Sequence, residues 1–121
     1  MATGLPLARP GDVIDAWSTW GDAEGVAYVL RTVNMEVMRL HLNAGARIPT
    51  HEAQGEVTIL CVQGRAGVSA LGQQHELNTG QLLYLLVQEP FELRGIDESS
   101  LLITVLRQPT TKPPLIGGGA E

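Results

Sequence analysis

The chain has 121 residues, one cysteine and a formal net charge of −5, with 8 basic and 13 acidic side chains. This length predicts one domain with its own hydrophobic core, and the single cysteine excludes an intramolecular disulfide framework. The basic residues are scattered, which argues against nucleic acid or an anionic membrane as a partner. Neither a signal peptide nor a membrane-spanning apolar run is readable, so we expect a soluble, cytoplasmic protein.

The first 25 residues contain proline and glycine and have no regular pattern of apolar positions. Trp17 and Trp20 lie three residues apart, a spacing that would place both on one face of a helical turn. We predict that residues 1–25 form an N-terminal segment that packs on the main domain or on a partner chain.

Residues 26–107 consist of short apolar and β-branched runs, separated by glycine, asparagine and proline. The predicted strands are residues 26–31, 35–42, 56–62, 66–71, 81–87, 91–94 and 99–107. Short strands at this spacing indicate an all-β sandwich or barrel. The three prolines and the glycine triplet of residues 108–121 predict an extended, flexible C-terminal tail.

Two of the predicted strands are apolar without alternation, VTILCV at residues 57–62 and LLYLLV at residues 82–87. A strand with one face in water alternates between polar and apolar residues, so both faces of these strands should be covered. A second sheet, the N-terminal tryptophan segment or a second subunit could provide the cover. We predict a homodimer.

The glycines of the chain have a distinctive spacing. Gly45 is followed by five residues and His51, and six residues separate Val57 from Gly64. This spacing resembles the first motif of the cupins, small antiparallel jelly-roll β-barrels in which a His-x-His pair and a glutamate lie between two glycines. In this chain Ala53 stands at the second histidine position and Val57 at the glutamate position.

The second cupin motif is also recognisable by its glycine. Fifteen residues separate Gly80 from Gly64, the end of the first motif, as in the smallest cupins. Leu86 then stands at the proline position of the motif, Gln88 at its second glycine, Phe91 at its histidine and Gly95 at its asparagine. The resemblance extends over about residues 33–106. It implies a small RmlC-like cupin with degenerate metal-binding motifs and little or no helix.

The resemblance also bears on cofactors. In metal-binding cupins the motif histidines and the glutamate hold a transition metal inside the barrel, whereas this chain keeps only His51. One protein ligand does not hold such an ion, because structural and catalytic sites use three or four, so we expect no cofactor. If a transition metal were bound, His51 and Glu56 would be the candidate ligands. Glu56 would then need a bulge at Gln54 and Gly55 to turn inward.

The other chemically active residues leave alternatives open. Arg39 and His41 share one face of a predicted strand, and the sequence does not decide whether this face looks into the barrel beside His51 or outward. His75 is expected on the surface. Cys61 could form a nucleophilic pair with His51, but a buried cysteine that serves as a small hydrophobic residue is the better interpretation.

The apolar substitutions in the motifs predict the function. They favour a pocket for a small, partly apolar organic molecule in a non-catalytic or weakly catalytic protein, with His51 orienting a carboxylate or carbonyl group. The predicted pocket residues are His51, Ala53, Val57, Ile59, Cys61 and Phe91. One alternative is a metal-dependent cupin enzyme, of dioxygenase or isomerase type, that uses His51 with recruited ligands. Another is a structural or regulatory dimer whose barrel is filled by Phe91.

Overall fold

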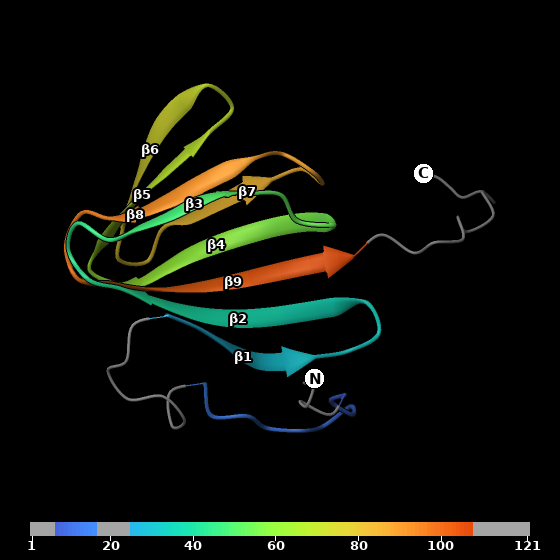
Figure 1. Cartoon of the computed structure of the whole chain (residues 1–121). Helices are drawn as coiled ribbons and strands as arrows, with labels where there is room; N and C mark the ends of the chain where they lie inside the picture. Colours follow the sequence, from blue (N-terminus) through green and yellow to red (C-terminus); the bar gives the residue numbers. More distant parts are fainter. Residues whose placement is uncertain (1–6, 17–24, 108–121) are drawn as a thin grey trace.

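The computed structural model describes residues 7–16 and 25–107 (Figure 1). The two tryptophans and the predicted C-terminal tail therefore lie outside the described residues. The described part contains no helix that could span a membrane. Its strands are β1 (Gly25–Arg31), β2 (Met35–Leu42), β3 (Arg47–His51), β4 (Gly55–Gln63), β5 (Arg65–Ala70), β6 (Gln73–Asn78), β7 (Leu82–Leu85), β8 (Phe91–Gly95) and β9 (Ser99–Arg107).

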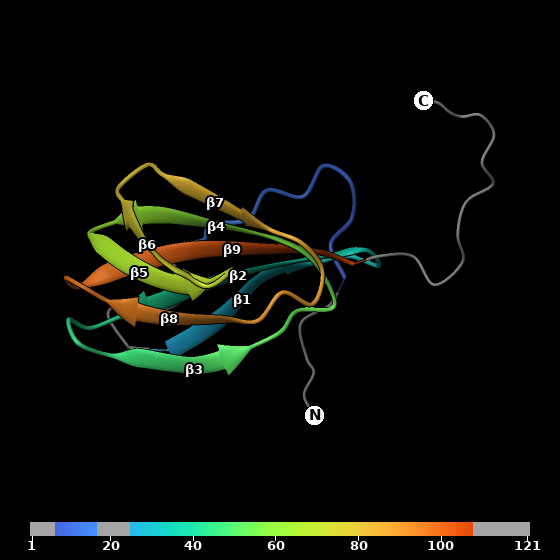
Figure 2. The ribbon, with the colours of Figure 1, turned by 90° about the horizontal axis from the view of Figure 1, so that it is seen from above.

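The strands form two sheets that face each other. One sheet has five strands in the order β1-β2-β9-β4-β7, and the other has four in the order β3-β8-β5-β6. All strand pairs are antiparallel. Figure 2 shows the two layers, with β7, β4 and β9 on one side and β3 and β8 on the other. The predicted all-β, antiparallel jelly-roll fold is confirmed.

All seven predicted strands are present, and the prediction missed two. The missed strands, β3 and β6, are the two edges of the four-stranded sheet. Most residues of both strands are exposed, and β3 contains Pro49. An edge strand tolerates proline and polar residues because one side of its backbone has no partner strand. These strands therefore lack the apolar run by which a strand is recognised.

The core lies between the sheets. Along β4, Val57, Ile59 and Cys61 are at most 1% exposed, whereas the side chains between them are only half-buried. This period of two assigns the first set to the interior and the second to the outer face. The same alternation assigns the apolar residues of β9, at positions 101, 103 and 105, to the interior.

The motif glycines lie where the backbone requires them. Gly45, Gly64 and Gly80 have φ angles of 86°, 79° and 90°, in a region that other residues rarely adopt. Gly64 has a second constraint, because a Cβ atom there would overlap the carbonyl oxygen of Glu98. The glycine spacing thus identified real turns.

The side of β2 that carries Arg39 and His41 is the outer face, because Leu40 and Leu42 on the opposite side belong to the core. His41 Nδ1 lies 3.2 Å from Ser100 Oγ, and His41 Nε2 lies 3.0 Å from Glu98 Oε2. The guanidinium of Arg39 donates a hydrogen bond to the backbone carbonyl of residue 16. Arg39 and His41 therefore do not share a pocket with His51.

Candidate functional site

The main candidate site is a cavity of about 240 Å³ between the two sheets. It lies near the end of β3 and the start of β4, where the first cupin motif was recognised. Its lining is apolar apart from one imidazole and one phenol. The lining residues are Val26, Tyr28, Met38, Leu40, Ile48, His51, Ala53, Phe91, Leu93, Ile103 and Val105.

His51 and Phe91 form one wall of this cavity. They are directly paired across β3 and β8, and their ring centroids lie 5.9 Å apart with an interplanar angle of 82°. This is the edge-to-face geometry that aromatic pairs prefer. Phe91 is 5% exposed, whereas His51 is exposed at the rim. A molecule in the cavity would therefore contact the Phe91 ring inside the cavity and the His51 imidazole at the cavity entrance.

The predicted pocket is only partly assembled at this cavity. His51, Ala53 and Phe91 line it together. Val57, Ile59 and Cys61 do not, because they lie in the packed core and are at most 1% exposed. They face the interior, as the cupin spacing predicts, but neighbouring side chains fill the space around them. Phe91 occupies part of the barrel and leaves an open volume beside it.

The thiol of Cys61 is buried and hydrogen-bonded to the backbone. Its Sγ donates hydrogen bonds to the carbonyl oxygens of Gly64, at 3.3 Å, and Gln63, at 3.5 Å. Burial raises the pKa of the Cys61 thiol, and the backbone hydrogen bond to Gln63 lowers it by less. A reactive thiolate needs the opposite, a lowered pKa and some exposure. The nucleophilic interpretation of Cys61 therefore has no support at this position.

This burial predicts that Cys61 resists a thiol-labelling reagent. At pH 8 the native protein should react with an aromatic disulfide at least about 100-fold more slowly than the protein in 6 M guanidinium chloride, because only the unfolded thiol is exposed and has an ordinary pKa. The labelling rate, followed by absorbance, measures this. Equal rates in the native and unfolded protein would show that the thiol is accessible.

Sequence reasoning missed the part of the cavity contributed by β1. Val26 and Tyr28 line the cavity and are more than half exposed at its edge. Tyr28 pairs with Met38, and Val26 pairs with Leu40. A predicted hairpin of β1 and β2 would have assigned Val26 to the inward face, because directly paired residues project on the same face and Leu40 is an evident core residue.

Three charged residues, Arg31, Glu36 and Arg107, lie at or just beyond the last row of cavity-lining residues on β2 and β9. Arg31 pairs with Glu36, and Glu36 pairs with the cavity-lining Val105, so the register assigns Arg31 and Glu36 to the inward face. Arg107 lies two residues after Val105 on β9 and shares its face. The Glu36 carboxylate also forms an ion pair with Arg107. Two guanidinium groups and one carboxylate give this group of three side chains one net positive charge.

The residues do not fit a cupin metal centre. The positions of its missing ligands are occupied by Ala53, Val57 and Phe91. Glu56, the predicted substitute, pairs with Leu106 and alternates with the buried Val57, so it lies on the outer face. Within residues 7–16 and 25–107, no three histidine, cysteine, aspartate or glutamate side chains are grouped to hold a metal ion.

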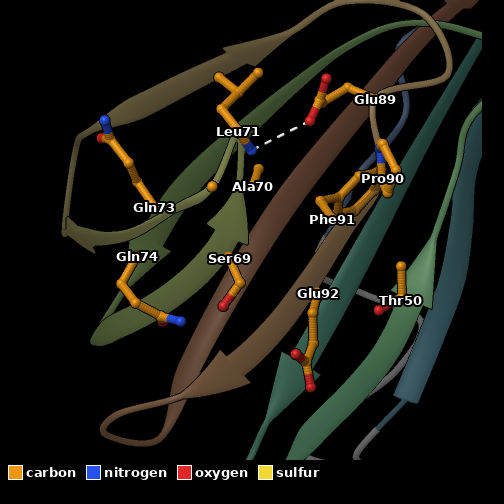
Figure 3. Close-up of a pocket in the computed structure, with 11 residues that line it drawn as sticks. Thr50, Ser69, Ala70, Leu71, Gln73, Gln74, Glu89, Pro90, Phe91 and Glu92 are labelled. Carbon is orange, nitrogen blue, oxygen red and sulfur yellow. Dashed lines mark hydrogen bonds between the residues drawn. The ribbon is translucent and has the colours of Figure 1, made fainter.

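A second hollow, of about 440 Å³, is an open groove beside the β5–β6 turn (Figure 3). Its polar groups are already engaged within the protein. Glu89 accepts a hydrogen bond from the backbone N–H of Leu71, and Glu92 accepts from Arg47. Gln74 accepts from Arg94. The groove therefore offers few free groups for recognition, and the cavity at His51 is the better candidate.

Comparison with solved structures places this architecture among the cupins. A cupin superfamily protein from Desulfitobacterium hafniense is similar over 88% of this chain and 100% of its own, at 16% identity and a TM-score of 0.69. An RmlC-like cupin from Methanocaldococcus jannaschii, with a double-stranded β-helix fold, is similar over 83% and 94%, at 14% identity and a TM-score of 0.71. Salicylate 1,2-dioxygenase from Pseudoaminobacter salicylatoxidans is similar over 66% of this chain and 25% of its own, at 15% identity and a TM-score of 0.62.

The structural similarity establishes the fold. It does not establish an activity, because one fold can host many unrelated functions. No family model and no curated protein matches the sequence. The chain is thus a protein of the cupin, RmlC-like fold. Its candidate site combines an apolar cavity with a single motif histidine.

Proposed function

We propose that this protein binds a small organic acid, with an apolar body, in the cavity beside His51 and without a transition metal. The observation that carries the proposal is the composition of the cavity, which is apolar in its interior and has His51 at its rim. Ligand pockets generally combine an apolar lining with a few placed polar groups that fix orientation. The apolar body of the ligand would pack against Phe91 and Ile103.

The hydrogen-bond donors at the cavity rim indicate the chemistry of the ligand's polar end. The imidazole of His51 offers a ring N–H to a carboxylate or carbonyl oxygen. The phenol of Tyr28, which also lines the cavity, offers a second donor. The net positive charge of the group formed by Arg31, Glu36 and Arg107 favours a carboxylate over a neutral carbonyl. The volume of about 240 Å³ suits a molecule of one ring or a short chain.

Benzoate is a suitable first probe, because it is small, apolar and singly charged. Titration of the isotope-labelled protein, followed by amide chemical shifts, should give shifts concentrated at Ala53, Phe91 and Leu93. A fragment of this size is expected to bind with about 4 kcal/mol, a Kd of about 1 mM. His51→Ala should weaken binding about tenfold, since a hydrogen bond to a charged group is lost.

Two controls separate the parts of this proposal. His75→Ala should leave benzoate binding unchanged, because His75 lies on β6 and bonds to the carbonyl of Ala70, away from the cavity. Benzamide, the neutral analogue, should bind more weakly than benzoate. Shifts spread over the whole surface, or equal binding by His51→Ala, would contradict the proposal. Stoichiometric Fe, Mn, Ni, Cu or Zn in protein purified without chelator would contradict its metal-free part and favour a metal-dependent enzyme instead.

A further inference from the structure

The cavity beside His51 opens between one edge of each sheet. It is lined by β1, an edge strand of the five-stranded sheet, and by β3, an edge strand of the four-stranded sheet (Figure 2). Val26 is 55% exposed, Tyr28 is 53% exposed, and His51 is also exposed. The opening between these two edges therefore presents one aliphatic side chain and two rings.

The C-terminal part of the chain is attached close to this opening. Val105 lines the cavity, and Arg107, the last residue of β9, lies two residues further, about 7 Å along the strand. Only β2 separates β9 from the edge strand β1, so that edge is about 10 Å away across the sheet. Residues 108–121, which lie outside the described residues, therefore start about 12 Å from the opening.

Residues 108–121 are polar or small except for one short stretch. Leu115 and Ile116 are the only large apolar residues among them, and Pro113 and Pro114 come directly before. Two consecutive prolines favour the extended polyproline II conformation, which loses little entropy on binding. Proline-rich segments in this conformation bind to grooves lined by aromatic side chains. The exposed rings at the cavity opening offer such a surface.

The cavity also has room for an aliphatic side chain. Its volume is about 240 Å³, and Phe91, Leu93 and Ile103 contribute to an interior that is apolar. An apolar cavity of about 150 Å³ can hold a benzene molecule. One branched side chain, such as that of leucine, therefore fits inside and removes its own apolar surface from water.

We propose that residues 113–116 dock at this opening within the same chain, with the two prolines on the rings of Tyr28 and His51 and the side chain of Leu115 in the cavity. Eight peptide units connect Arg107 to Leu115 and can span up to about 26 Å, twice the distance required. Because the segment is tethered, its effective concentration at the cavity is in the millimolar range. A contact with a millimolar Kd then forms in a large share of the molecules.

Docking would regulate the cavity, and this consequence rests on the proposed function. The side chain of Leu115 and the apolar body of an organic acid would occupy the same space beside Phe91. The docked segment therefore competes with the ligand and lowers its apparent affinity, as expected for an autoinhibitory contact.

NMR of the ligand-free full chain tests the docking itself. The chain has one phenylalanine, so the ring resonances of Phe91 are unambiguous. Nuclear Overhauser effects are expected between this ring and the methyl groups of Leu115 or Ile116. An intramolecular contact does not depend on concentration, so these effects should keep their relative intensity when the protein is diluted from about 1 mM to 0.1 mM.

A serine variant, Leu115→Ser with Ile116→Ser, removes the apolar pair and leaves residues 7–16 and 25–107 unchanged. It should shift the amide resonances of Ala53 and Leu93, because the cavity is no longer occupied. The matched control, Thr110→Ser with Thr111→Ser, changes two residues of the same C-terminal part that are not apolar. This control should keep the wild-type resonances.

Two results of the NMR experiments would overturn the proposal. One is the absence of contacts to the Phe91 ring together with identical cavity resonances in the wild type and the serine variant. The other is a set of contacts that disappear on dilution, because these would come from the C-terminal segment of a second copy rather than from the same chain.

Benzoate titration separates the docking from the proposed function. The serine variant should bind benzoate at least about threefold more tightly than the wild type and the threonine control, since the competing segment is lost. Equal benzoate affinity in all three proteins would overturn the autoinhibitory contact and leave the proposed function standing. Contacts to the Phe91 ring without benzoate binding by any of the three would support the docking and contradict the proposed function.

Discussion

Replacing Ala53 and Phe91 with histidine is expected to create a transition-metal site in the cavity. His51 and Phe91 are direct neighbours across β3 and β8, with ring centroids 5.9 Å apart. Ala53 lines the same cavity. The double variant would therefore bring three imidazoles to one rim, the ligand number of many zinc sites. Co²⁺ or Zn²⁺ should bind with one ion per chain and a Kd of about 10 µM or tighter, against no stoichiometric binding by the wild type.

The absorption spectrum of added Co²⁺ and elemental analysis after desalting measure this gain. The same double variant with His51→Ala is the matched control and should lose most of the uptake, because only two imidazoles remain. Phe91→His should also cost about 2–4 kcal/mol of folding stability, since Phe91 is buried. A folded double variant that binds no more metal than the wild type would show that the assignment of these positions to the cupin motifs is wrong.

Gly64→Ala is expected to be among the most destabilising single substitutions in this chain. The alanine would be strained at a φ of 79°, and its Cβ would overlap the Glu98 carbonyl in the turn that precedes β9. Strain of this kind costs about 1–3 kcal/mol, and the forced movement of the backbone adds to it, so we expect a loss of about 3–5 kcal/mol. Urea unfolding followed by circular dichroism gives the difference in free energy.

Gly80→Ala separates the two causes. Gly80 has a φ of 90° but nothing within 4 Å of the position of an added Cβ. This variant therefore has the backbone strain without the overlap, and we expect a loss of about 1–2 kcal/mol. Equal losses in the two variants would show that the close approach to the Glu98 carbonyl contributes nothing.

The fold could be predicted largely from the sequence. Regularly spaced short apolar runs predicted strands, and the glycines at 45, 64 and 80 marked turns that the structure places at positive φ. These signals are local, because a turn needs its glycine and a core strand needs its apolar residues wherever they pair. The edge strands β3 and β6 carry no such signal, since water rather than the core satisfies much of their surface.

The candidate site could be predicted only in part. The motif spacing brought His51, Ala53 and Phe91 together, and they do line one cavity. It also included Ile59 and Cys61, which face the interior but lie in its packed region. Facing inward is a property of one strand, whereas an open volume depends on how side chains from both sheets fill the space between them.

The sequence by itself determined the seven apolar strands, the turns and the motif frame with a single histidine. Only the tertiary structure decided that Arg39 and His41 lie outside, that β1 contributes Val26 and Tyr28 to the cavity, and that the second apolar side of β4 and β7 is an outer face. The physical reason is that alternation divides a strand into two faces without saying which one is covered. That choice is made by residues far apart in the chain when the two sheets pack.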